Sequence, residues 1–403
     1  MKNPVSITLK CAGKTLAGIA AVILIFSVSP VYDFEKPHPF EGPDIFDPYA
    51  GTDSLTEWKR ANFHTHTRVK GLFNECPEWP DSVYEDYRRL GYDILTFSNH
   101  NRLTLHPYDT ALQVNVYEHG YNPFKFHKLV FGADKVTLFD HLLPLFPFQK
   151  QWQLDILGKK ADLIVLNHPD RTFNVTGRCM SRLTGYRIME GDSGVDNEFR
   201  HLDEALDAGH YAFALTSDDC HDSDASWCTG VRCCWIDTPS GQYGDLRDAL
   251  ARGRFYSMRI PDFGNGDWTA KYAGNAKLPR IESIGVRDDT IHLELSRKAS
   301  LITFTGQGHV VLAESRDSDS FAYAMAPEDH YARITAFFND GCVIYTQPFA
   351  RYDKACAVSP YRVSPHPVNA CLTILYNLLV IGLAAACICF LSHKKDKAGT
   401  AVN

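Results

Sequence analysis

The feature that most constrains the fold is an alternation of short apolar runs and helical patterns between residues 61 and 253. The runs are rich in β-branched and aromatic residues, and three helical patterns end at Gly91, Gly209 and Gly253. Seven strands that alternate with helices predict a parallel α/β barrel or sheet. The predicted strands are 61–63, 92–98, 128–131, 163–166, 186–189, 211–215 and 231–236.

Beyond Pro279 the pattern changes to a period-two alternation of apolar and polar residues without a helical pattern. Glycine and aspartate residues separate the runs, as in antiparallel sheets. This pattern predicts a small antiparallel β-sandwich over residues 278–352. We therefore expect an α/β unit at 57–262 followed by this sandwich.

An uncharged apolar run covers residues 370–391, and His393, Lys394 and Lys395 follow it at once. Its length matches the roughly 20 residues that a helix needs to cross a bilayer. We predict a transmembrane helix over 368–392 and a basic cytoplasmic tail over 393–403.

A second segment without charge, residues 15–32, follows Lys2, Lys10 and Lys14. It predicts an N-terminal membrane anchor over 1–31, although a cleaved signal peptide would show the same basic start and apolar run. A proline-rich linker covers 32–56. Basic residues at the outer ends of both segments predict that both termini are cytoplasmic and that the folded part is extracytoplasmic.

The composition is that of a globular protein, with a formal net charge of −7 and 45% hydrophobic residues. It excludes an intrinsically disordered chain and gives no sign of a strongly basic nucleic-acid surface. Of the 12 cysteines, Cys220, Cys228, Cys233 and Cys234 form the one close group. A structural zinc site is the weaker interpretation of these cysteines, because no Cys-x-x-Cys pair occurs. We interpret the cysteines outside the apolar segments as structural thiols or disulfides.

Histidines and carboxylates follow six of the predicted strands, at the point where each strand ends. The carboxyl ends of strands are where alternating α/β folds build their sites. Imidazole together with carboxylate binds zinc, manganese or iron, so the pattern predicts a site for two or three divalent ions. A serine nucleophile is disfavoured because no Gly-x-Ser-x-Gly motif occurs. The residues are His64 and His66, His100, Asp134, His168, Glu190, and Asp218, Asp219 and His221.

The motifs at these positions resemble those of a known superfamily. They read Phe-His-Thr-His-Thr at 63–67, Ser-Asn-His-Asn at 98–101, Asn-His-Pro at 167–169 and Ser-Asp-Asp-Cys-His at 217–221. In order and spacing they are similar to the motif series of the PHP (polymerase and histidinol phosphatase) superfamily. The resemblance implies a distorted seven-stranded (β/α) barrel, a dinuclear or trinuclear metal site, and hydrolysis of a phosphoester.

The resemblance also implies a role for each residue. His64, His66 and Asp219 would hold the first ion, and Asp134 would bridge the first and second ions where the family usually has a glutamate. Glu190 follows a strand but has no firm role in the family, and we place it, like Asp218, outside the ligands. The remaining ligands would be His141 and His168 at the second ion, and His100 and His221 at a third.

Two departures weaken the third site. Lys70 and Gly71 stand where the family commonly has an aspartate or histidine, and Asn99 replaces an aspartate. We therefore predict a dinuclear centre, with Lys70 free to contact substrate phosphate and His221 partly free for proton transfer.

In this interpretation the ions activate water for attack on phosphorus, and His221 or His100 protonates the leaving oxygen. Arg102, Arg171 and Lys70 would bind the phosphate. A tyrosine-rich and asparagine-rich insertion at 108–126 is expected to form a lid.

The extracytoplasmic placement favours a small phosphomonoester or phosphodiester of a nucleotide, sugar or lipid head group. Membrane lipid would contact the terminal helices, and no nucleic acid partner is expected. The alternative is a membrane-tethered binding protein that keeps a metal site but has little or no catalytic activity.

Overall fold

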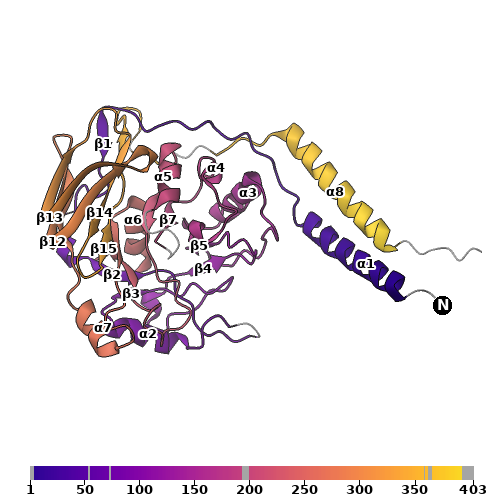
Figure 1. The fold of residues 1–403 in the computed structure, drawn as a ribbon, viewed down its shortest axis with the longest axis horizontal. Helices are drawn as coiled ribbons and strands as arrows, with labels where there is room; N and C mark the ends of the chain where they lie inside the picture. Colours follow the sequence, from indigo (N-terminus) through magenta and orange to yellow (C-terminus); the bar gives the residue numbers. More distant parts are fainter. Residues whose placement is uncertain are drawn as a thin grey trace, which may run out of the picture.

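The computed structural model describes residues 4–52, 55–71, 74–192, 199–357, 359–361 and 365–392. Most of them form a mixed α/β unit, from which two long helices extend side by side (Figure 1). These are α1 (Pro4–Ile25) and α8 (Ala370–Ser392). They run antiparallel: Lys14 in α1 donates from Nζ to the carbonyl of Leu391 near the end of α8, at 2.7 Å, whereas Ser29, just after α1, donates from its backbone N–H to Asn377 Oδ1 in the first half of α8, at 3.0 Å.

A five-stranded sheet forms one part of the mixed α/β unit. Its strands, in spatial order, are β4 (Val116–His119), β5 (Lys128–Phe131), β6 (Leu163–Leu166), β7 (Ile188–Glu190) and β8 (Phe213–Leu215). All their residues are buried, which explains why β5, β6, β7 and β8 read as largely apolar runs. β6, β7 and β8 are parallel, whereas β5 is antiparallel to both β4 and β6.

A larger, mostly antiparallel sheet contains the remaining strands. Its main path runs β1, β16, β14, β15, β10, β9, β2, β3, and β12 joins it to β11 and β13. The bounds are β1 (Asp44–Phe46), β2 (Lys59–Asn62), β3 (Ile94–Leu95), β9 (Arg232–Ile236), β10 (Phe255–Arg259), β11 (Ile281–Arg287), β12 (Thr290–Gly306), β13 (Val310–Ala324), β14 (Tyr331–Phe337), β15 (Val343–Tyr345) and β16 (Phe349–Tyr352).

In the part of the chain that the structure describes, six shorter α-helices lie around the sheets. They are α2 (Pro80–Arg89), α3 (Pro147–Gly158), α4 (Gly177–Met180), α5 (Arg200–Asp207), α6 (Tyr243–Arg252) and α7 (Trp268–Asn275). The three helices predicted from spacing are confirmed as α2, α5 and α6. Gly253 ends α6 with φ of 75°, a left-handed conformation that glycine adopts without strain from a Cβ.

The predicted seven-stranded barrel followed by a β-sandwich is wrong, although each predicted strand position carries a strand. Within the described residues the strand ladders do not close into a barrel. β9, the seventh predicted strand, pairs with β2 and β10, and β10 pairs with β15. Three of the seven predicted barrel strands, β2, β3 and β9, therefore share one sheet with the C-terminal strands, while the other four lie in the five-stranded sheet. The two sheets touch at two single-residue bridges, Thr65 with Cys220 and His100 with Glu118.

The prediction of two transmembrane helices is also wrong. Among the described residues only α8 is long and apolar enough to cross a membrane, with a mean hydropathy of 2.5. The apolar part of α1 is the shorter stretch Cys11–Ile25, which follows Lys10 in the sequence and itself contains Lys14. The predicted basic tail, 393–403, lies outside the described residues.

Candidate metal centre

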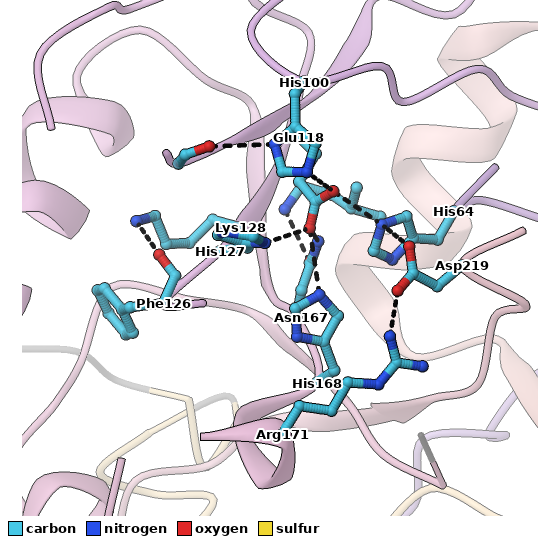
Figure 2. Close-up of polar contacts among 12 residues, drawn as sticks. His64, His100, Glu118, Phe126, His127, Lys128, Asn167, His168, Arg171 and Asp219 are labelled. Carbon is cyan, nitrogen blue, oxygen red and sulfur yellow. Dashed lines mark hydrogen bonds and ion pairs between the residues drawn. The ribbon is translucent and has the colours of Figure 1, made fainter. Parts of the chain in front are cut away.

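Glu118 in β4 lies at the centre of a cluster of histidines at one end of the five-stranded sheet (Figure 2). Its two carboxylate oxygens face different ring nitrogens. From Oε2 the distances are 3.2 Å to His64 Nε2, 3.3 Å to His66 Nε2 and 3.0 Å to His100 Nε2. From Oε1 they are 3.1 Å to His127 Nδ1 and 3.2 Å to His168 Nε2. A carboxylate placed in this way can bridge two ions.

Strand direction explains why these residues meet. β4 and β6 run the same way, because both are antiparallel to β5, so Glu118 and His168 lie at their carboxyl ends. β5 runs the opposite way and contributes the residue before it begins, His127. Single-residue bridges bring the chain after β2 and β3 to the same edge, with His64, His66 and His100.

Asp219 and Glu190 complete the surroundings of His64. Asp219 Oδ1 lies 3.0 Å from His64 Nε2 and 3.1 Å from His66 Nε2. Glu190 Oε1 lies 3.1 Å from the other ring nitrogen of His64, Nδ1. A carboxylate behind a histidine ring fixes its orientation and increases its basicity, which is the usual arrangement around a metal-bound imidazole.

Asp218 has a different role from its neighbour. Its carboxylate accepts hydrogen bonds from Tyr87 Oη at 2.7 Å, from Asn62 Nδ2 at 2.8 Å, and from three successive backbone amides, those of residues 230–232. These bonds occupy both oxygens. Asp218 therefore holds the backbone next to the cluster in place rather than offering a ligand atom.

A further group lies toward the solvent. Glu75 Oε2 is 3.1 Å from His66 Nδ1, and Glu75 Oε1 is 3.7 Å from His100 Nε2. The ring of His221 stacks on that of His66 with centroids 4.2 Å apart, and the side chain of His221 is 45% exposed. His66, Glu75 and His221 form a possible third ligand set.

The cluster is buried and highly charged. Burial opposes the negative charge of Glu118, but His64, His127 and His100 outweigh it and hold its pKa well below the usual range. Burial likewise opposes protonation of His64, yet Asp219, Glu118 and Glu190 raise its pKa well above normal. So many coupled charges in a dry site are typical of a functional centre.

The ligand atoms fit a metal better than they fit one another. His64 Nε2 is buried and makes no hydrogen bond within the described residues, although two carboxylate oxygens lie close to it. Ligand atoms that converge on one point, rather than pairing as donors and acceptors, are expected around a cation. Imidazole with carboxylate suits zinc, manganese or iron. The sets that could hold an ion include His64, His66, Glu118 and Asp219, and separately His100, Glu118 and His127.

The backbone is strained at the same edge. Asn101, His168 and Asp219 have positive φ angles of 49°, 27° and 51° although none is a glycine. Non-glycine residues in this region cost on the order of 1–3 kcal/mol each and collect at functional sites. The rest of the fold therefore holds these strand ends in position.

The structure does not bring two of the sequence-predicted ligands to the cluster. Asp134 follows the carboxyl end of β5 and is exposed; because β5 is antiparallel, this end is the far one. His141 lies with its Nδ1 2.6 Å from the carbonyl oxygen of Phe26, beside α1. We therefore leave both out of the proposed centre. The structure does bring together His64, His66, His100, His168, Asp219 and His221.

The predicted phosphate-binding residues also separate. Arg171 lines the cavity in front of the cluster and donates from Nη1 to Asp219 Oδ2. Arg102 is exposed and donates to the carbonyl of Lys70, which is exposed as well. Neither lines the cavity, whose volume is about 590 Å³. Its lining includes His100, Glu118, Lys125, His127, His168, Arg171, Asp219, His221 and Trp227.

Sequence reasoning missed Glu118, His127 and Glu75. The first lies in the segment 108–126 that was expected to form a lid, but this segment contains the buried strand β4. Val114, Val116 and Tyr117 precede Glu118 and carry the same signal as the other strands. His127 precedes β5 rather than following it, so a search for ligands after the ends of strands could not find it.

No protein-family model matches the sequence, and no curated protein matches it. Among solved structures the chain is similar to the novel lesion-specific endonuclease PfuEndoQ from Pyrococcus furiosus, at 13% identity and a TM-score of 0.32. The match covers 48% of this chain and 56% of that chain. Similarity at this level carries no argument for activity here. The neighbour is an endonuclease, and we withdraw the expectation that nucleic acid is not a partner.

Proposed function

We propose that the chain is a metal-dependent phosphoesterase of the PHP type. The observation that carries the proposal is the position of Glu118, whose two oxygens face separate groups of histidines. A carboxylate in this position can bridge a pair of ions, and the four PHP-like sequence motifs lie around it. Together these support a dinuclear centre of zinc, manganese or iron.

Two ligand sets share Glu118. His64, His66 and Asp219 would hold one ion, and His100 and His127 the other. His168, which faces the same oxygen as His127, would complete the second set. When bound, the ions would lower the pKa of a water molecule and neutralise phosphoryl charge.

The remaining residues would position the substrate and move a proton. Lys125 and Arg171 line the cavity and supply positive charge for the phosphoryl oxygens. His221, half exposed at the cavity, would donate a proton to the leaving oxygen as the phosphorus–oxygen ester bond breaks. Water supplies the new oxygen on phosphorus, so the products are an alcohol and a phosphate.

We further propose that α8 spans a membrane, with the metal centre on the extracytoplasmic side. Only 11% of its apolar window is buried, which is not expected for a core helix. Lysines follow it directly in sequence, and the positive-inside rule places them in the cytoplasm.

The test is metal analysis of the full chain, purified in detergent, combined with hydrolysis of p-nitrophenyl phosphate and bis(p-nitrophenyl) phosphate. We expect about two equivalents of a transition metal and an activity that chelation abolishes and metal restores. Activity that survives complete removal of metal would overturn the proposal. Stoichiometric metal without hydrolysis of any phosphoester would instead support the binding-protein alternative.

A further inference from the structure

We propose that an apolar surface beside the metal cavity lies on the bilayer that α8 spans, so that the enzyme acts on a phosphoester carried by a membrane lipid. This surface, the apolar rim, consists of Leu145, Phe146 and Phe173. The choice of substrate rests on the proposed phosphoesterase function, whereas the contact with the bilayer does not.

The apolar rim is fastened to the first turns of α8. The ring of Phe148 packs edge-on against that of Tyr376, at 4.9 Å between centroids, and Phe146 lies 6.3 Å from the same ring. Gln149 Nε2 donates to Tyr376 Oη at 3.2 Å and to the carbonyl of Ser27 at 3.2 Å. In Figure 1, α3, which begins beside these residues, is on the side of the globular unit that faces α1 and α8.

The contacts with α8 determine where the apolar rim lies along the axis of that helix, and so relative to the bilayer. Tyr376 lies six residues after the first residue of α8, or about 9 Å along the axis at 1.5 Å per residue. Thr373 and Asn377 on the same turns hydrogen-bond with the backbone of Val31 and Ser29. If α8 crosses the membrane, these turns occupy the interfacial layer, where tyrosine is enriched. Residues that touch them must lie at the bilayer surface.

The rim is exposed where a soluble surface would usually be polar. Phe173 is 83% exposed, Leu145 52% and Phe146 46%. Asn174 Nδ2 donates to the carbonyl of Pro144 at 2.8 Å, so the loop that carries Phe173 is tied to the loop that carries Leu145. Clustered exposed apolar side chains mark an interaction site, and lipid is the partner that the neighbouring span provides.

The same loop reaches the metal cavity. Arg171, two residues before Phe173, lines the cavity and contacts Asp219. The rings of Phe124 and Phe173 pack edge-on with their centroids 5.4 Å apart. Lys125, the residue after Phe124, also lines the cavity. Cations beside an apolar rim match the order of a lipid surface, in which an anionic phosphate lies above the acyl chains.

Depth-dependent quenching tests the contact with the bilayer and is independent of activity. The full chain is placed in phosphatidylcholine vesicles, and lipids brominated near the head of the acyl chain are compared with unbrominated lipids. We expect Phe173→Trp to add fluorescence that brominated lipid quenches. Leu105→Trp, which replaces a 77% exposed leucine outside the rim, should add fluorescence that it does not quench. Equal quenching of the two variants would overturn the contact.

Activity tests the substrate class. Phosphatidic acid in vesicles is compared with p-nitrophenyl phosphate, using the double variant Leu145→Ser/Phe173→Ser and the control Leu105→Ser. We expect the double variant to lose about tenfold on phosphatidic acid, as loss of buried apolar contact predicts, and to keep its rate on the soluble ester. An equal effect on both esters, or no cleavage of phosphatidic acid by an enzyme active on soluble esters, would overturn the lipid substrate. If the parent protein cleaves neither ester, the phosphoesterase proposal fails while the quenching result stands.

Discussion

Both ends of the five-stranded sheet carry carboxylates, but the two ends differ in what these carboxylates can do. At one end Glu118, His127 and His168 point their ligand atoms at one another in a buried space. At the other end Asp134 is exposed, and Asp162 accepts a hydrogen bond from Tyr243 Oη at 2.9 Å. A polar residue at a strand end is therefore a ligand only where neighbouring strands bring others to it.

The sharpest test of this comparison exchanges one carboxylate at each end. Glu118→Gln should remove bound metal and lower phosphoester hydrolysis by at least about 1000-fold, since it removes the charge shared by both ligand sets; that equals roughly 4 kcal/mol of barrier. Metal content and turnover are measured on the same samples. Asp134→Asn should leave both unchanged, and loss of metal in this variant would reverse our assignment of the two ends.

A pair of histidines provides the second test. His127→Gln should reduce metal affinity and activity by about 100-fold, as expected when a metal site is disturbed close to the ion. His141→Gln keeps a side chain that can donate to the carbonyl of Phe26, so affinity should not change. Competition with a chelating dye measures both. If His141→Gln were the more damaging change, the antiparallel direction of β5 would not explain the ligand set.

The third test compares two carboxylates that accept hydrogen bonds at opposite ends of the five-stranded sheet, Glu190 and Asp162. Glu190→Gln leaves His64 with a weaker partner at Nδ1 and should lower metal affinity by about tenfold. Asp162→Asn should have no effect on metal. A full set of ions bound as tightly in Glu190→Gln as in the parent would show that the contact does not orient His64.

The smallest effect on activity is expected for Glu75, on the solvent side of the histidine cluster. Glu75 is 39% exposed, so Glu75→Gln should lower activity by only about threefold, because solvent screens a half-exposed charge. Glu85→Gln, a change of the same kind on the exposed side of α2, is the control. Anomalous scattering would determine whether a third ion occupies the set formed by Glu75, His66 and His221. Loss of that ion in Glu75→Gln would establish Glu75 as one of its ligands. A third ion that persists in this variant would exclude Glu75 as a ligand.

Sequence patterns located the strands well, because buried strands need continuous apolar runs whatever their neighbours are. The runs at 128–131 and 163–166 coincide with β5 and β6. Their relative direction left no trace in these runs, since a buried strand reads the same in either direction. This missing information led to Asp134 as the bridge and hid His127.

The third site shows a related limit. In the PHP-like motif series a further ligand is expected about five residues after His66, where this chain has Lys70 and Gly71. Glu75 lies farther along the chain, and a loop returns its carboxylate to His66. Loop paths depend on contacts with the rest of the molecule, such as the hydrogen bond from Ser223 to Glu78 at 3.1 Å, and spacing does not encode them.

The sequence by itself determined the positions of seven strands, the apolar composition of α8, and that histidines and carboxylates follow the ends of strands. These features depend on local composition and period, which each segment carries on its own. The tertiary structure alone decided that β5 is reversed, that Glu118 rather than Asp134 is at the centre, and that one sheet joins the α/β strands to the C-terminal strands. Each of these depends on hydrogen bonds and burial between segments far apart in the chain, where the free energy of pairing, rather than the identity of one residue, selects the arrangement.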